Sequence, residues 1–391
     1  MKILFVHEVD YVEKVVFEMH EIPELLADRG HQITFVDFPE HEKLWPPRIR
    51  SRTEHISGRV VPSSQLILVR LARVFPFPFD RIWSAATSWI KIRQLLRSAR
   101  PDLIFLYGVP TNGWQTTRLA LRLKIPIIYR AIDVSHEIRR SIFWRAVKVA
   151  EKYVVRNVDL VLTNNTAMSK HMISLGATEE KIQVLFPGVA GIEGKKILAH
   201  AEKRHDVILF MGTLFDFCGL ANLITWIEQW KGTARDCELW ILGDGPNKRD
   251  IIKQAEKCDY LDKLKLFGFV PFDQLYEIMK IATVAVLPFE EIPVTHKALP
   301  GKVPQYITAG LPVVSTRLNG LSSLLAHGNG ALYAAPGKEF VDQINKLLDN
   351  DEMRRDVVEL GQNELNRVCR WPNVIAEIEM IISQMAGKND I

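Results

Sequence analysis

The segment at residues 299–320, LPGKVPQYITAGLPVVSTRLNG, constrains the fold more than any other part of the chain. Its Pro-Gly pair predicts a loop, and residues 302–308 follow as a short helical run. Gly310 predicts the end of that helix, because glycine adopts the left-handed conformation without strain. The apolar β-branched run after Pro312 is typical of a strand covered on both faces, as in an α/β sheet.

Two polar side chains of this short helix predict a site for an anion. Lys302 and Gln305 are three positions apart, so both project from one face of the helix. The first N–H groups of a helix have no partner within it, and with a lysine ammonium they attract negative charge. The alternative is an ordinary helix–strand corner of a sheet, so the rest of the chain has to decide.

Strands and helices alternate along the whole chain. Apolar stretches that each feed a polar loop lie at residues 2–6, 102–107, 126–130, 159–163, 238–246, 264–270 and 284–289. This alternation predicts parallel sheets with helices on both faces, and 391 residues suffice for two such domains. A polar stretch at about residues 190–205 predicts the linker. We therefore expect domains at residues 1–189 and 190–368, followed by a C-terminal segment at 369–391.

Composition excludes several other classes of protein. The four cysteines form no CxxC pair, which indicates free thiols in a reducing cytosol and makes a zinc site an unattractive hypothesis. The N-terminus enters polar sequence directly after a strand, unlike a signal peptide, and no apolar run is long enough to span a bilayer. We expect a cytoplasmic protein with no nucleic acid as partner.

The net charge of +4 hides a strongly basic stretch at residues 43–100. It holds twelve Lys and Arg but only Glu54 and Asp80 as acids, a local balance of +10, which predicts contact with an anionic surface or substrate. Residues 66–79 are apolar with interleaved arginines, and a helical pattern continues through Trp83 and Trp89. Two interpretations stay open: a basic helix that packs on its own domain, or an interfacial helix at a membrane.

The segment at residues 299–320 resembles the "LPNK-LFEYMA-AG-PVV" segment of family 4 glycosyltransferases. Other stretches resemble the same family in the same order: LLADRGHQITFVD, KIQVLFPGV and GDGP at residues 243–246. The resemblance covers nearly the whole chain. It implies the GT-B fold, in which two Rossmann-like domains face a central cleft and a C-terminal helix, here at about 373–385, crosses back to the first domain.

The resemblance implies an enzyme that moves a sugar from a UDP- or GDP-linked donor with retention of configuration and without a required metal or other cofactor. Family positions for donor binding fall on Gly212, Thr213, Leu214, Gly243, Gly245, Phe269, Val270, His296, Gly301, Lys302 and Gln305. In the family the lysine faces the diphosphate, and the position of Gln305 faces the ribose hydroxyls. An amide can still exchange hydrogen bonds with hydroxyls.

The sequence departs from the family pattern at four charged positions. Thr213 stands where the family has arginine, and Cys218 where it has lysine. The family's two glutamates fall on Lys297 and Gln305. Negative charge on a leaving diphosphate must be matched by something. Two alternatives therefore stay open: a GT-B binding or scaffold protein with a degenerate donor site, and a nucleotide-sugar epimerase.

The first domain holds the expected acceptor site. Asp133 and His136 lie in the loop RAIDVSH, where the family often has a histidine or a His-Asp pair facing the reacting centre. Either residue is a candidate catalytic group that orients the acceptor hydroxyl, although an aspartate after a strand is often only a helix cap. His7 and Arg139 are weaker candidates for acceptor binding.

The acceptor that the resemblance favours is a cell-envelope glycan or a lipid-linked glycan. Synthesis of such molecules takes place at the inner face of a membrane. We expect the basic stretch 43–100 to attract anionic lipid or a lipid-diphosphate acceptor there, which makes the protein a candidate for peripheral association.

Overall fold

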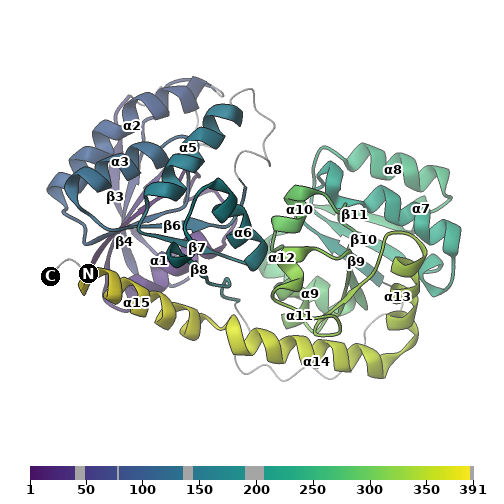
Figure 1. Cartoon of the computed structure of the whole chain (residues 1–391). Helices are drawn as coiled ribbons and strands as arrows, with labels where there is room; N and C mark the ends of the chain where they lie inside the picture. The colour runs from purple at the N-terminus through teal and green to yellow at the C-terminus, as the bar shows by residue number, and fades with distance from the viewer. Residues whose placement is uncertain (40–48, 77–78, 135–143, 190–206, 388–391) are drawn as a thin grey trace. The chain divides into compact units, whose positions relative to one another are not determined.

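The computed structural model describes residues 1–39, 49–76, 79–134, 144–189 and 207–387 (Figure 1). The chain divides into two compact units, one formed by Met1–Leu185 with the segment from Pro372 on, the other by Phe186–Trp371. These limits, at Leu185 and Trp371, differ by four and three residues from the domain ends expected at 189 and 368.

The first unit is built on a sheet of eight strands in the order β3-β4-β2-β1-β5-β6-β7-β8. Every neighbouring pair is parallel except β3 and β4. The strands are β1 (Lys2–Val6), β2 (Gln32–Asp37), β3 (Arg52–Ser57), β4 (Gln65–Arg70), β5 (Leu103–Leu106), β6 (Ile127–Ala131), β7 (Leu160–Thr163) and β8 (Ile182–Val184). The central strands β5 and β6 are buried along their whole length, as expected when helices cover both faces.

The helices of this unit are α1 (Glu18–Asp28), α2 (Phe79–Ser98), α3 (Gly113–Leu123), α5 (Trp144–Asn157), α6 (Thr166–Leu175), the single turn η1 (Glu179–Lys181) and α15 (Trp371–Gly387). The C-terminal helix α15 is tied to this unit by polar contacts. Glu379 pairs with Arg29 at 2.5 Å, and Gln183 donates to Glu377 at 2.8 Å. A helix distant in sequence thus completes the first unit.

The first helix begins at Glu18, after a turn in which the carboxylate of Asp10 accepts from the amides of residues 12 and 13. One expectation for local structure is wrong in part. A basic helix does not run through residues 66–79. Residues 65–70 form β4, paired in register with β2, and α2 begins only at Phe79. Pairing of alternating apolar side chains outweighs helix propensity in this stretch.

The second unit is built on six parallel strands in the order β11-β10-β9-β12-β13-β14. The strands are β9 (Val207–Met211), β10 (Glu238–Leu242), β11 (Leu264–Gly268), β12 (Val284–Leu287), β13 (Val313–Ser315) and β14 (Ala331–Tyr333). Its α-helices are α7 (Leu220–Trp230), α8 (Lys248–Lys257), α9 (Phe272–Ile281), α10 (Pro293–Lys297), α11 (Lys302–Thr308), α12 (Asn319–Ser322), α13 (Lys338–Asp349) and α14 (Asp351–Val368), and its single turns are η2 (Asp216–Cys218), η3 (Thr233–Arg235) and η4 (Leu261–Lys263).

Both sheets have a point where the strand order reverses direction. In the first unit it lies between β1 and β5, and in the second between β9 and β12. Ligands of doubly wound sheets bind beyond the carboxyl ends of the strands at such a point. The predicted fold class, two Rossmann-like parallel-sheet domains, is confirmed, and each unit offers one place for a ligand.

Candidate active site

The strongest candidate site of the second unit lies where β9 ends and α11 begins. The buried Tyr306 of α11 accepts a hydrogen bond from the amide of Met211, the last residue of β9, at 2.6 Å. This bond brings the start of α11 against Gly212. A Cβ atom on Gly212 would lie 2.4 Å from Nζ of Lys302, and the φ of this glycine is +131°. Only glycine leaves room for the ammonium here.

The ammonium of Lys302 has apolar neighbours. Nζ lies 4.3 Å from the ring centroid of Phe210 and 5.2 Å from that of Phe289. Among the described residues it makes no hydrogen bond or ion pair. Desolvation lowers the pKa of Lys302 to about 8, although part of the side chain stays open to solvent. A cation that is held against aromatic rings without a counter-ion is prepared to bind an anion.

Thr213 and Cys218 stand where the family has an arginine and a lysine, and neither supplies a positive charge. Cys218 is buried, and its thiol donates to the carbonyl of Thr213 at 3.2 Å. Burial raises the pKa of this thiol, so it stays neutral near pH 7. The Thr213 residue itself is exposed.

The glycines of GDGP allow two loops to touch through their backbones. A Cβ on Gly243 would lie 2.1 Å from the carbonyl oxygen of Gly212, and a Cβ on Gly245 would lie 2.6 Å from the amide nitrogen of Leu214. The Leu214 amide donates to Asp244 at 3.1 Å, and its carbonyl accepts from Asn247 at 3.0 Å. The polar backbone groups of Leu214 therefore hold the loops together.

The other residues that the sequence predicts for donor binding differ in how deeply they are buried. Phe269 follows β11 and is 75% exposed, whereas Val270 packs against the core of its unit. His296 of α10 is half-buried, and its Nδ1 atom has no partner among the described residues. Gly301 is exposed and Gln305 is half-buried at the start of α11.

In the first unit, His7 follows β1 at the point where the strand order reverses. Its Nδ1 accepts from the amide of Glu8 at 2.9 Å, and its ring stacks on Tyr107 at 5.2 Å. Burial lowers the pKa of His7 to about 3, so the ring is neutral near pH 7. The accepted bond places the remaining proton on Nε2, which leaves a fixed N–H donor for a ligand.

The neighbouring Glu8 was missed by the sequence reasoning. Its buried carboxylate accepts from the amides of Thr111 and Asn112 at 2.5 and 2.8 Å and from the Thr111 hydroxyl. These groups stand at the N-terminus of α3, where an anion is stabilised. A Cβ on Gly108 would lie 2.6 Å from the Glu8 side chain. An acid two residues after a buried strand was the available signal.

Asp133 lies after β6 and is exposed. Nearby protein atoms and the carboxylate of Glu18 raise its pKa, but solvent screens much of this effect.

Arg130 lies in β6, shortly before Asp133 in the chain. Its guanidinium is fully buried and bonds both oxygens of Glu18 at 2.8 Å. Removing one partner of such a pair costs about 3–5 kcal/mol. His136 and Arg139 lie outside the described residues.

Two family profiles match consecutive parts of the chain. The one described as "Glycosyltransferase Family 4" matches residues 19–190, and the one described as "Glycosyl transferases group 1" matches residues 194–364. The chain belongs to the family 4 glycosyltransferases. It is an enzyme of the glycosyltransferase class.

Relatives and solved structures agree with this family. The 2-deoxystreptamine glucosyltransferase of Streptomyces kanamyceticus is 24% identical over 322 residues, 78% of this chain and 77% of that protein. Sucrose-phosphate synthase from Thermosynechococcus elongatus superposes with a TM-score of 0.75 at 14% identity, over 99% of each chain. HepE from Anabaena, solved with UDP, gives 0.69 at 16% identity, over 98% of this chain and 100% of that one. These structures show the shared fold.

In this glycosyltransferase the ammonium of Lys302 lies directly against the glycine loop after β9 of the second unit. No group of three or more His, Cys, Asp or Glu side chains among the described residues could hold a metal ion. None of the described helices is long and apolar enough to cross a bilayer.

Proposed function

We propose that the protein transfers a sugar with retained configuration from a nucleoside diphosphate donor to an acceptor hydroxyl. The observation that carries this proposal is the ammonium of Lys302, which stands without an anionic partner among the described residues against Gly212. A diphosphate is the part of such a donor that needs a cation. Complexes of HepE with UDP and with UDP-glucose support a UDP-linked donor.

The reaction forms a bond from the acceptor oxygen to the anomeric carbon and breaks the bond from that carbon to the diphosphate. The departing diphosphate gains negative charge, and Lys302 stabilises that charge at the end of β9. The amides of Gly212, Leu214 and Val303 already donate to backbone carbonyls, and residue 304 is a proline, so the ammonium of Lys302 is the main positive group offered to this charge. For retention in one step, the acceptor oxygen approaches the anomeric carbon from the face that the diphosphate leaves, and the acceptor proton passes to an oxygen of the departing diphosphate.

The acceptor we propose is a glycan of the cell envelope or its lipid-linked form, bound by the first unit. His7 supplies a neutral Nε2–H donor for an acceptor hydroxyl, and Asp133 or His136 orients the attacking oxygen. The similarity to a 2-deoxystreptamine glucosyltransferase makes a small aminocyclitol the competing acceptor class.

Calorimetric titration with UDP, GDP and ADP tests the donor site. We expect one nucleotide to bind and the variant Lys302→Met to weaken it about 100-fold, since a charged contact to phosphate is worth about 2.7 kcal/mol or more. Lys346→Met, at an exposed position of α13, is the matched control. No binding of any nucleotide would overturn the proposal.

Transfer itself is tested with labelled UDP-glucose and UDP-N-acetylglucosamine in the presence of lipid-linked glycans, envelope polysaccharide or 2-deoxystreptamine. Product with the anomeric configuration of the donor supports the proposal, and inverted product contradicts retention. Nucleotide binding without turnover of any donor, and without conversion of the donor alone, would favour the scaffold protein with a degenerate site. Conversion without acceptor would favour an epimerase.

A further inference from the structure

Three neighbouring helices of the first unit share one sequence pattern: a tryptophan followed by a basic residue four and eight positions later. The members are Trp89, Arg93 and Arg97 in α2, Trp114, Arg118 and Arg122 in α3, and Trp144, Lys148 and Lys152 in α5. Residues at this spacing lie on one side of a helix. None of the other six tryptophans of the chain is followed by basic residues at both positions.

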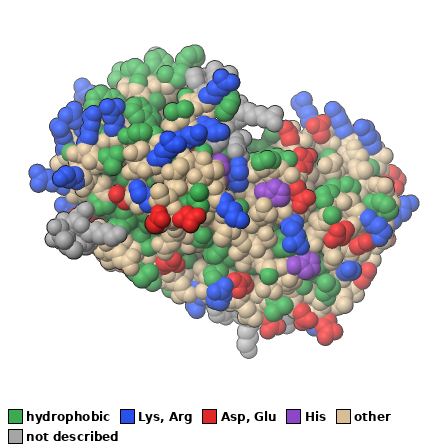
Figure 2. Space-filling view, viewed as in Figure 1, with side chains coloured by type: hydrophobic (Ala, Val, Ile, Leu, Met, Phe, Trp, Pro, Cys, Tyr) green, Lys and Arg blue, Asp and Glu red, His purple; other side chains and the backbone are tan. Residues whose placement is uncertain are grey.

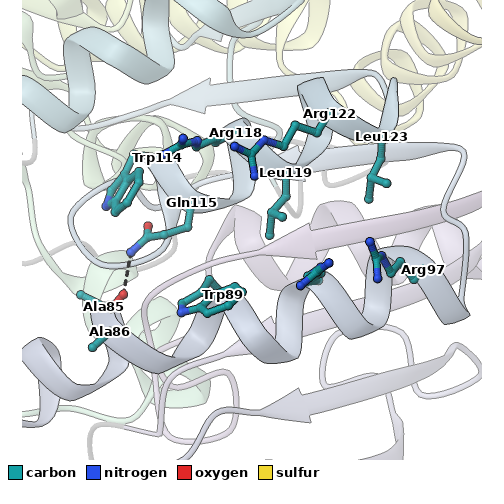
Figure 3. Close-up of a pocket in the computed structure, with 11 residues that line it drawn as sticks. Ala85, Ala86, Trp89, Arg97, Trp114, Gln115, Arg118, Leu119, Arg122 and Leu123 are labelled. Atoms are coloured by element: carbon teal, nitrogen blue, oxygen red, sulfur yellow. Dashed lines mark hydrogen bonds between the residues drawn. The ribbon is translucent and has the colours of Figure 1, made fainter.

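The first two copies of the pattern line a groove between α2 and α3 with a volume of about 640 Å³. Gln115 of α3 donates to the carbonyl of Ala85 in α2 at 2.8 Å and ties the helices together (Figure 3). The indole rings lie near this tie, and the basic side chains follow along both helices (Figure 3). Trp89 is 40% and Trp114 39% exposed. The groove therefore has an aromatic end and a cationic end.

The four arginines of the groove, Arg93, Arg97, Arg118 and Arg122, are exposed and take part in no hydrogen bond or ion pair among the described residues. Acids are nearly absent from these helices. Asp80 of α2 is buried against Arg73, Glu151 of α5 is buried, and α3 has no acid. The groove is thus open to anions from outside the chain.

Other bases of the stretch 43–100 have internal tasks. Arg70 is buried between Asp10 and Asp37, at 2.6 and 3.3 Å, and Arg59 bonds two backbone carbonyls at 2.7 Å. Arg81 donates to the carbonyl of Glu8 at 2.8 Å. The expected anion-facing surface is consequently narrower than the stretch 43–100, and it extends instead to α3 and α5.

Large apolar side chains accompany the cations on the same helices. Phe79 is 61% and Ile90 58% exposed in α2, and Leu121, Leu123, Trp144 and Val149 are exposed in α3 and α5. Figure 2 shows hydrophobic and basic side chains together over this part of the first unit. An acidic glycan would leave these side chains in water, and the bases of a nucleic acid stack on indole rings but do not bury the aliphatic side chains.

We propose that the faces of α2, α3 and α5 dock on the surface of a bilayer that contains anionic lipids. Arginines and lysines reach lipid phosphates, while the indoles and aliphatic side chains enter the interface between headgroups and acyl chains. Trp114 and Trp144 stand at the first turns of α3 and α5, which begin at the carboxyl edge of the sheet. Docking would therefore bring the edge that holds His7 towards the lipid.

Vesicle sedimentation tests the docking surface independently of sugar transfer. We expect binding to phosphatidylcholine vesicles with about 30 mol% phosphatidylglycerol, little binding to phosphatidylcholine alone, and weakening by added salt. Replacing the four groove arginines by glutamine should lower the partition coefficient by about fivefold per residue at low salt. Replacing them by lysine should preserve most of the binding, because a bilayer attracts either cation.

Matched controls separate this surface from general charge. Arg249, Lys253, Lys257 and Lys346 are exposed in the second unit, and their replacement by glutamine should leave vesicle binding nearly unchanged. Trp89→Ala with Trp114→Ala should weaken binding several-fold, whereas Trp230→Ala, 43% exposed in α7, should not. Each variant is checked for an unaltered thermal melting curve.

Several outcomes would overturn the proposal. Equal binding to neutral vesicles removes the role of the cations, and undiminished binding of the glutamine variant removes the groove. Loss of binding in the lysine variant would mean that the arginines bind individual phosphates in a fixed geometry, and not a bilayer surface through charge alone. Tighter binding to single-stranded poly(U) than to the anionic vesicles assigns the surface to nucleic acid.

Discussion

The two sheets of this glycosyltransferase reverse strand order at equivalent points, yet the loops there are opposite in charge. In the first unit the carboxylate of Glu8, after β1, bonds the N-terminus of α3. In the second unit the loop after β9 contributes Gly212, and Lys302 at the start of α11 faces it. The first unit fills its own anion-binding position, and the second leaves a cation for an anion from solution.

This difference teaches how one topology serves two purposes. A doubly wound sheet fixes where loops and helix starts meet. The N–H groups at the start of α3 favour negative charge, whereas the start of α11 presents the ammonium of Lys302. In the first unit the carboxylate of Glu8 supplies the negative charge, and its bonds to the start of α3 stabilise the unit. A glycine at the same place admits the ammonium of Lys302, which we propose meets a phosphate.

The largest expected effect is the loss of Lys302 on sugar transfer. Lys302→Met removes the cation that meets the departing diphosphate, and we expect kcat/KM to fall by about 10³-fold, or about 4 kcal/mol. The same change should raise the melting temperature without ligand by roughly 2–4 °C if relief of the desolvated charge amounts to about 1 kcal/mol. Initial rates and calorimetry measure the two effects. A variant with normal turnover would show that the second unit does not depend on this cation.

The counterpart in the first unit is Glu8→Ala. It leaves the amides of Thr111 and Asn112 without their buried acceptor, so we expect a loss of about 3 kcal/mol in the free energy of unfolding by urea. Nucleotide affinity should stay within about twofold of the wild type. Glu13→Ala, an exposed acid nearby, serves as the control. A stable Glu8→Ala protein with weakened nucleotide binding would reverse the assigned roles of the two units.

The pH dependence of nucleotide binding should follow Lys302. Its pKa of about 8 in the free protein means that rising pH removes the charge that the diphosphate needs. We expect affinity to be about tenfold weaker at pH 9 than at pH 7, after which it continues to fall. Because ligand phosphates are already ionised in this range, Lys302→Met should give a flat profile. Titration calorimetry at several pH values measures the slope, and tighter binding at high pH would contradict the assignment.

The smallest effect concerns the missing family arginine. Thr213 is exposed, so Thr213→Arg can be accommodated without burial of its charge. We expect nucleotide affinity to rise by about three- to fivefold at low salt, as a partly exposed charge contact is worth about 1 kcal/mol. Thr213→Gln, of similar length but neutral, is the control. Equal gains in both variants would indicate packing rather than charge.

Much of the fold was accessible from local patterns. The segment 302–308 is helical as predicted, and Gly310 ends it with a φ of +79°. The prediction of a helix through residues 66–79 was wrong because arginines between apolar residues fit a strand and a helix alike. Pairing in register with β2 is what makes residues 65–70 the strand β4. Lys302 was predicted from its position on the short helix, whereas Glu8 and Arg130 act through partners more than 100 residues away.

The sequence by itself determined the alternation of strands and helices, the family, and Lys302 with the glycine loops as its surroundings, because these depend on spacing within short segments. Tertiary structure decided which charges are already satisfied. It buries Arg70 between two aspartates, leaves Lys302 against aromatic rings, and sets the tryptophans and arginines of α2 and α3 along one groove. Which charges pair depends on which loops and helix faces the sheet brings together. A pattern within a short segment does not specify which distant residues become neighbours.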